Sequence, residues 1–307
     1  MAAVTATTAR TPTARRLARR KTANRVLWGL CGLALALVVA PIVWIVAGVV
    51  SHAVAGWHAS VLTHTHAQSP RGLLNAVIGT FTIMAGVVVI AGALGVAGGV
   101  YLAEYCPQGK GGFLRGTSEV LSGVPSIVLG YVGYIALVTH FHWQFGLLPA
   151  WIVVGVLVMP YVTKSTEIAI RNVPTEYREG AEALGLPAGY TLRRLVIGPA
   201  LPGIVTGLIF AAAISVGETA PLIYTAHWSD TTNFAFVHSP FGGVGYLTYA
   251  VFEFLNEPSA VDHALASDAA LILVVVVLVL IVVSRLVVSL TQRYSPDRPQ
   301  TTRRRRR

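Results

Sequence analysis

The sequence predicts an all-α integral membrane protein with six transmembrane helices and both termini in the cytoplasm, and three observations lead to that prediction. The chain of 307 residues is 54% hydrophobic and only 12% charged. Apolar runs such as residues 26–50 and 270–284 approach or exceed the ~20 residues that a helix needs to cross the hydrocarbon. The basic residues gather on one side of the membrane once the helices are drawn. The net charge of +10 therefore indicates orientation in the membrane rather than a soluble basic domain.

The predicted spans follow the apolar runs in order: Val26 to Val50, Leu73 to Leu102, Val120 to Val138, Pro149 to Thr163, Pro202 to Ala226, and Ala269 to Val288. With both termini inside, this topology puts every Lys and Arg except Arg71 on the cytoplasmic side. Pro125 and Pro160 predict kinks in the third and fourth spans. Close helix packing is expected at the glycines of the second span, at positions 79, 86, 92, 95, 98 and 99.

Both ends of the chain are expected to remain in the cytoplasm. The "AVA" at Ala53 to Ala55 looks like a signal-peptide cleavage site, but the apolar run before it is 25 residues long. Signal-peptide cores span roughly 7 to 15 residues, so we expect an uncleaved first helix. The basic segments 1–25 and 291–307 are interpreted as topology signals facing the anionic inner leaflet. Nucleic-acid binding is the weaker alternative, and no nucleic-acid partner is expected.

Three kinds of site are disfavoured by the sequence. No G-x-x-x-x-G-K-[ST] motif occurs, so a nucleotide that drives transport must be held by another chain. Cys31 and Cys106 fall in a span and in an inner loop, where they supply no extracytoplasmic disulfide framework. All nine histidines fall outside, but their close pairs lack acidic or cysteine partners at fixed spacing, so no metal site is expected.

The last outer loop, His227 to Ser267, is the longest and contains acidic residues but no Lys or Arg. Long ordered loops are more often functional than short connectors. The loop is therefore predicted either to dock an external protein or to lie along the membrane interface as an aromatic belt. The aromatic residues on which both predictions depend are Trp228, Tyr246, Tyr249 and Phe252.

A polar segment, "TEYREGAEALG" at residues 175–185, lies in the inner loop 164–199. Pro174 and Thr175 are helix-start residues, the following glutamates suit the first turn, and Gly185 stops the helix. A helix of about ten residues is marginal in water, so it needs a surface to lie against. Its apolar stripe is Tyr177, Ala181 and Leu184. That surface is predicted to be either a groove in a partner protein or the membrane helices of the same chain.

The same segment resembles a known motif. "EGAEALG", a nine-residue spacer and "LVIGPALPG" are similar to the EAA loop of binding-protein-dependent ABC importers. Glu179, Gly180, Ala181 and Gly185 match the pattern, with Gly180 in place of an alanine. Gly198 replaces the proline of the pattern, and Pro199 follows one residue late. The resemblance implies that this helix docks into a cleft of an ATPase subunit, so the expected coupling residues are Tyr177, Glu179, Gly180, Ala181, Leu184 and Gly185.

Further motifs narrow the resemblance. "LAEY" after the second span, "SGVPSIVLGYVG" in the third and "VGETAPLIYTA" in the fifth are similar to phosphate-importer permeases of the PstA type. The resemblance covers residues 73–288 and implies a type I permease domain over 73–290, preceded by a first helix and outer loop over 26–72. It implies a prokaryotic inner-membrane location and half of a pathway completed by a homologous permease of the PstC type.

The same resemblance implies the remaining partners. These are a cytoplasmic ATPase dimer of the PstB type, which holds ATP and Mg²⁺, and an extracytoplasmic phosphate-binding protein of the PstS type. The chain itself is expected to bind no cofactor and to catalyse no reaction.

Glu218 is the carboxylate that the sequence places well inside a span, so it should face the bundle interior, a pathway or a partner. Together with Thr219, Pro221 and Ser126 it is the predicted pathway or substrate site. Two roles for Glu218 are open: it accepts hydrogen bonds from protonated phosphate oxygens, or it pairs with an arginine. Span five contains no basic residue, so a positive partner is expected from a second permease chain. A purely structural hydrogen bond between helices is the alternative.

Three alternatives to phosphate import are open. The cargo could be another oxyanion such as molybdate or sulfate. The chain could instead be a proton-coupled secondary transporter in which Glu218 cycles a proton, or a structural membrane scaffold.

Overall fold

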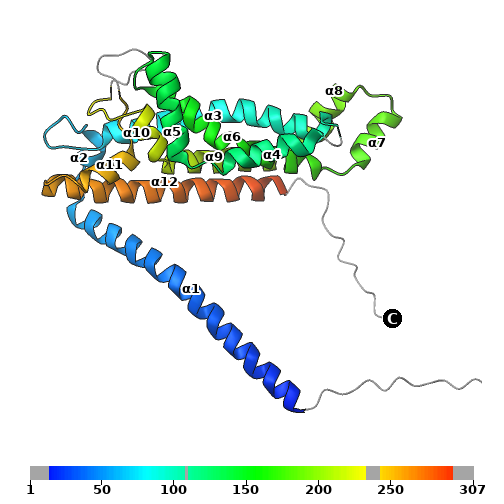
Figure 1. The fold of residues 1–307 in the computed structure, drawn as a ribbon, viewed down its shortest axis with the longest axis horizontal. Coiled ribbons are helices and arrows are strands. Elements are labelled where there is room, and N and C mark those ends of the chain that lie inside the picture. The colour runs from blue at the N-terminus through cyan, green and yellow to red at the C-terminus, as the bar shows by residue number, and fades with distance from the viewer. Residues whose placement is uncertain (1–13, 108–109, 233–242, 293–307) are drawn as a thin grey trace, which may run out of the picture. The chain divides into compact units, whose positions relative to one another are not determined.

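The computed structural model describes residues 14–107, 110–232 and 243–292, and every regular element in these ranges is a helix (Figure 1). The chain divides into two compact units, Met1–Ser51 and His52–Arg307, which are described separately. The described part of the first unit belongs to helix α1 (Ala14–Gly56), whose last five residues are counted with the second unit. Helix α1 contains an apolar span over Arg19–Gly56. It contains the predicted first span and extends it at both ends.

The second unit contains the remaining helices, three of them π-helical segments named η1 to η3. In chain order they are α2 (Ser60–Thr63), α3 (Leu74–Val100), η1 (Tyr101–Tyr105), α4 (Lys110–Ser122), α5 (Ser126–Gly133), η2 (Tyr134–His140), α6 (Leu147–Arg171), α7 (Glu176–Ala183), α8 (Ala188–Thr191), η3 (Leu192–Val196), α9 (Ile197–Gly217), α10 (Ala220–Thr225), α11 (Leu247–Phe254) and α12 (Ala260–Gln292).

The third predicted span is sharply bent. Among the described residues, five helices are long and apolar enough to cross a membrane, and a sixth span is the pair Gly111–Ser122 and Ser126–His140, bent by 91°. The bend lies at Pro125, whose ring removes a backbone donor and disfavours helical geometry in the residue before it. The number of spans is as predicted, and the kink expected at Pro125 is a full break between two helices.

The fifth span was expected as one helix from Pro202 to Ala226, and that expectation is wrong. Helix α9 ends at Gly217, and Glu218 is extended, with φ −72° and ψ 134°. Helix α10 begins at Ala220 with Pro221 in its first turn, where a missing N–H costs nothing because first-turn donors have no helical partner. Glu218 therefore lies at a break between two helices and not in a helix interior.

Helix α6 forms the centre of the second unit and packs against α3 and α9. Its Val154, Val158 and Val162 are fully buried. Glycines of α3 let the two backbones approach, because a Cβ on Gly86 would overlap the Trp151 ring and one on Gly95 would lie 2.7 Å from Cβ of Val162. Small residues serve this purpose in membrane helix bundles, so the predicted packing role is confirmed at Gly86 and Gly95.

Candidate functional site

The predicted inner-loop helix is present as α7, Glu176–Ala183, and local signals fix its end. Gly185 has φ +67°, a conformation that costs glycine little. The Gly185 N–H donates to the Glu182 carbonyl at 2.9 Å, and the Leu186 N–H donates to the Ala181 carbonyl at 3.0 Å. This hydrogen-bond pair is a Schellman motif, which satisfies the last carbonyls of a helix. The sequence prediction of a stop at Gly185 is confirmed.

The apolar stripe of α7 is divided between two environments. Ala181 is 2% exposed and packs on the chain itself, whereas Leu184 is 78% exposed. Tyr177 is 37% exposed, and nothing lies within 4 Å of a Cβ built on Gly180. Tyr177, Gly180 and Leu184 therefore share one uncovered face, which we call the docking face. Glu179 is also exposed, beside this face.

One arginine attaches α7 to the membrane helices. Arg178 Nη2 lies 2.5 Å from Glu104 Oε1 and donates to the Ile170 carbonyl at 3.1 Å, while Nη1 donates to the Val173 carbonyl at 3.0 Å. Glu104 belongs to η1, directly after α3, and Ile170 lies in the last turn of α6. A guanidinium presents five donors in a rigid fork, so one side chain can hold both helix ends at once. Arg178 therefore links α7 directly to the ends of α3 and α6.

A second ionic cluster joins neighbouring helices on the same side of the unit. Glu167 of α6 is 8% exposed; its Oε1 accepts from Arg115 Nε at 2.7 Å and lies 3.0 Å from Arg171 Nη2. Both arginines also donate to the Leu102 carbonyl in η1, at 3.4 and 3.3 Å. Helices α4 and α6 and the end of α3 are thus held by one buried carboxylate, and removing a partner of such a carboxylate is strongly destabilising.

The predicted pathway residues meet at the break between α9 and α10. The Ser126 hydroxyl at the start of α5 is hydrogen-bonded to the Glu218 carboxylate. Pro221 lies against α5, because a Cβ on Gly130 would be 2.5 Å from Pro221 Cα. Thr219 lies between Glu218 and the first turn of α10. The structure therefore brings Ser126, Glu218 and Pro221 together from two segments that are distant in the sequence.

Helix α11 contacts the backbone at the break between α9 and α10. The Thr248 hydroxyl of α11 donates to the Glu218 carbonyl at 2.9 Å, which satisfies a group that the interrupted helix leaves without a partner. Within the described residues Glu218 forms no ion pair, and its one side-chain partner there is neutral. The break is thus a polar site assembled from α5, α9, α10 and α11, with a single half-buried carboxylate.

Two aspartates of the outer segments, Asp230 and Asp262, are paired with basic side chains of the same chain. His66 Nδ1 lies 2.8 Å from Asp230 Oδ1, and His66 Nε2 lies 3.3 Å from Asp262 Oδ1. Arg71 donates to both oxygens of Asp262 at 2.8 Å, and Trp228 Nε1 donates to Asp230 at 2.6 Å. These pairs tie three outer segments together. Over the described ranges, no group of three His, Cys, Asp or Glu residues suits a metal ion.

The aromatic residues of the last outer loop do not form one surface. Tyr246 is 1% exposed and belongs to the core, and burial raises the pKa of its hydroxyl, so it stays neutral. Trp228 stacks on Tyr249 with ring centroids 5.2 Å apart, and Phe252 remains 52% exposed. The expectation that all four serve a docking surface or an interfacial belt is therefore wrong for Tyr246. Residues 233–242 of this loop lie outside the described ranges.

The sequence reasoning missed Arg178 and Thr248. An arginine inside a short inner-loop helix and a glutamate just after a span were visible signals. The pairing of Arg178 with Glu104, 74 residues earlier in the chain, could not be predicted from the sequence. Thr248 carried no signal, because its partner is a backbone carbonyl that a continuous helix would have satisfied.

Comparisons with known proteins agree with this architecture. Residues 95–296 match the family model described as "Binding-protein-dependent transport system inner membrane component". The Mycobacterium tuberculosis protein named "Phosphate transport system permease protein PstA 2" is 47% identical over 276 residues, covering 90% of this chain and 91% of that protein. The Bacillus subtilis "Probable ABC transporter permease protein YqgI" is 32% identical over 67% of this chain and 71% of its own length.

A solved structure shares the fold. A chain of the structure titled "Inward facing conformations of the MetNI methionine ABC transporter" superposes with a TM-score of 0.56, covering 71% of this chain and 97% of that one. The sequence identity is 18%, so this likeness concerns the fold alone.

Proposed function

We propose that this chain, which belongs to the family of binding-protein-dependent transport system inner membrane components, is the permease subunit of an ATP-driven phosphate importer. The observation that carries the proposal is the exposed docking face of α7, held to α3 and α6 through Arg178. Phosphate is supported as cargo by the named relatives, which are phosphate permeases at 47% and 31% identity.

Coupling would begin at the docking face. An ATPase subunit binding there would cover Tyr177 and Leu184, whose apolar surface is otherwise left in water. When the ATPase pair closes on ATP, Arg178 passes the displacement of α7 to Glu104 and to the last carbonyls of α6. ATP and Mg²⁺ belong to that partner, and this chain contributes no catalytic residue.

The break at Glu218 is the proposed pathway site. Monobasic phosphate carries protonated oxygens that can donate to a carboxylate, so Glu218 and Ser126 can exchange their mutual hydrogen bond for bonds to the ion. Because a carboxylate repels the ion's negative charge, a cation must compensate. We expect that cation from a homologous permease across the pathway, since none pairs with Glu218 in the described part of this chain.

An exposed apolar face of α5 is consistent with contact to that second permease. Along one side of the helix, large apolar side chains are about half exposed: Ile127, Val128, Tyr131 and Val132. They lie beside Ser126, so a partner packed on this face would border the break. An extracytoplasmic binding protein would then deliver phosphate to the outer loops.

Uptake of labelled phosphate into proteoliposomes tests the proposal, with both permeases, the ATPase and the binding protein reconstituted. Leu184→Asp places a charge on the docking face and should abolish ATP-dependent uptake and ATPase association. Glu182→Lys is the matched control, because Glu182 is exposed on the same helix and, at 100° per residue, lies opposite that face. Normal uptake with Leu184→Asp would refute the coupling assignment.

Uptake measurements in the same proteoliposomes distinguish phosphate from other substrates and ATP from a proton gradient as the driving force. Uptake that prefers molybdate or sulfate over phosphate would reassign the substrate while leaving the coupling site intact. Uptake that persists without the ATPase and collapses with an uncoupler would instead identify a proton-coupled transporter.

A further inference from the structure

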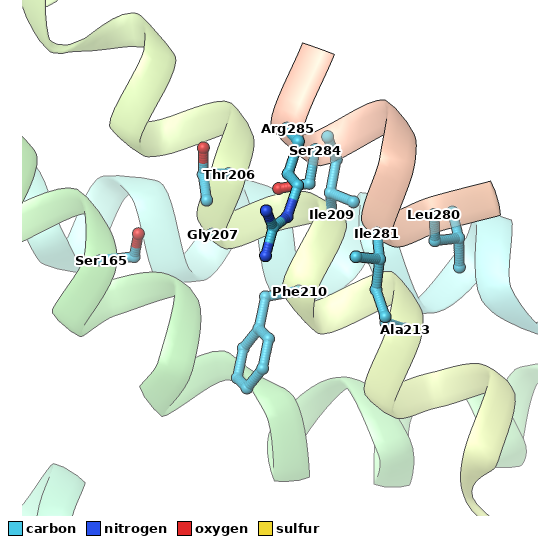
Figure 2. A pocket seen from close by; sticks show the side chains of 10 residues that line it. All are labelled: Ser165, Thr206, Gly207, Ile209, Phe210, Ala213, Leu280, Ile281, Ser284 and Arg285. Carbon is cyan, nitrogen blue, oxygen red and sulfur yellow. The ribbon is translucent and has the colours of Figure 1, made fainter. Parts of the chain in front are cut away.

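An apolar pocket lies between α6, α9 and α12, away from both parts of the candidate site (Figure 2). Its volume is about 370 Å³, within the range of small-molecule sites. Phe210 and Ala213 of α9 and Ile281 of α12 form apolar walls, and Arg285 of α12 lines the same space. Figure 2 shows the Arg285 side chain pointing from α12 toward α9 and into the pocket.

Arg285 is the one charged residue among those that line this pocket in the described part of the chain. No ion pair or side-chain hydrogen bond to Arg285 occurs among the described residues. The nearby hydroxyls of Ser165 and Thr206 donate to the Gly203 and Pro202 carbonyls, at 2.9 and 2.8 Å, and among the described residues neither oxygen accepts from Arg285. A guanidinium cannot lose its proton, so in an apolar setting it requires an anion or water.

The depth of Arg285 in the membrane identifies the kind of anion. Between Ala269 and Arg285 the helix is free of charge and about 24 Å long at 1.5 Å per residue, close to the thickness of the hydrocarbon. Arg285 directly follows this apolar run, at the depth expected for the lipid phosphates of one leaflet. The C-terminal end of α12 lies toward the same end of the unit as α7, on the side assigned to the cytoplasm (Figure 1). Basic pockets between transmembrane helices at this depth suit anionic lipid headgroups.

We propose that this pocket binds an anionic phospholipid of the inner leaflet, with its phosphate on Arg285 and an acyl chain along Phe210 and Ile281. The guanidinium suits an anion such as a lipid phosphate, and the apolar walls suit an acyl chain attached to it. Free inorganic phosphate satisfies the first requirement only. This site is independent of the phosphate pathway proposed above.

Native mass spectrometry of the complete transporter tests the assignment, after exchange into detergent with equal amounts of phosphatidylglycerol and phosphatidylcholine. Wild type should retain phosphatidylglycerol preferentially, and Arg285→Gln should lower that retention about fivefold, the effect of one basic residue at a lipid surface. Arg194→Gln removes an exposed cytoplasmic arginine and should change nothing. Arg285→Lys should keep most of the preference, and Ala213→Phe, which fills the pocket, should abolish it.

Four results would overturn the proposal. One is equal retention of phosphatidylglycerol by wild type, Arg285→Gln and Ala213→Phe. Another is equal retention of the two lipids by wild type. The third is a photo-crosslinker at position 281 that labels only a partner protein chain, because the groove would then be a subunit interface. Radiolabelled inorganic phosphate that binds in an Arg285-dependent way without displacing lipid would likewise assign the site to the free ion.

Discussion

Two regions of the molecule handle charge in opposite ways. At the ends of α3 and α6, arginines and glutamates are paired: Arg178 with Glu104, and Glu167 with two arginines. At the break between α9 and α10, the partners of Glu218 within the described ranges are neutral. The paired region is suited to transmitting force between helices, because breaking a pair is costly. The unpaired region retains capacity for another ligand, because its carboxylate is not neutralised within the described chain.

Arg178→Ala should have the largest effect, because it breaks the paired region. It leaves Glu104 largely buried without its cation and is expected to cost about 3 kcal/mol of unfolding free energy. It also separates α7 from α3 and α6, so uptake should be lost. Thermal unfolding of the purified complex and phosphate uptake measure the two effects. In the double variant Arg178→Gln with Glu104→Gln, stability should largely return while uptake stays low; recovery of both would show that Arg178 acts through stability alone.

Glu218→Gln tests the unpaired region and should reduce uptake without unfolding the protein. A hydrogen bond to a charged group contributes about 1.5–3 kcal/mol, so losing it in the transport step should slow uptake at least about tenfold. The amide keeps the size of the side chain and can still accept from Ser126, so thermal stability should change by less than about 1 kcal/mol. Unchanged uptake with unchanged ATP coupling would exclude a transport role for Glu218.

Gly130→Ala should disturb the packing of the same break. Its Cβ would lie 2.5 Å from Pro221 Cα, and because that atom is backbone, α5 and α10 must separate. Overpacking of this kind typically costs about 1–3 kcal/mol. Gly217→Ala is the matched control, since nothing lies within 4 Å of its Cβ position. If both alanine variants unfold at the wild-type temperature, the contact between α5 and α10 is looser than described.

Gly180→Ala should have the smallest effect on the chain itself. Glycine in a helix interior costs about 0.8–1 kcal/mol relative to alanine, and the added methyl meets no atom of this chain. Unfolding of the isolated permease should therefore be unchanged or slightly later. Uptake by the assembled transporter reports how closely the ATPase approaches α7, and a fall in uptake without loss of stability would indicate backbone contact there.

The features that sequence predicted well are those with local causes. The bounds of α7 followed from Thr175, the first-turn glutamates and Gly185, all within one short segment. The bend at Pro125 followed from the missing N–H of proline. The break at Glu218 did not, because the hydropathy of Pro202 to Ala226 is continuous and Pro221 was interpreted as a kink within one helix.

Contacts between residues that are far apart in the chain could not be predicted from the sequence. Arg178 and Glu104 are 74 residues apart, and each is an ordinary surface residue when considered alone. The division of the α7 stripe, with Ala181 buried and Leu184 exposed, depends on how α7 lies on the ends of the membrane helices. Ser126 and Glu218 were both expected near the pathway, but only the folded chain brings them into one hydrogen bond.

The most direct test of the central claim is a cross-link from the docking face. Leu184→Cys, with Cys31 and Cys106 replaced by serine, would be treated with a short thiol-specific bifunctional reagent in the active reconstituted transporter. We predict an adduct between this chain and the ATPase subunit, and none from Thr63→Cys at the opposite end of the unit. A transporter that imports phosphate normally while Leu184→Cys forms no adduct with the ATPase would contradict the account.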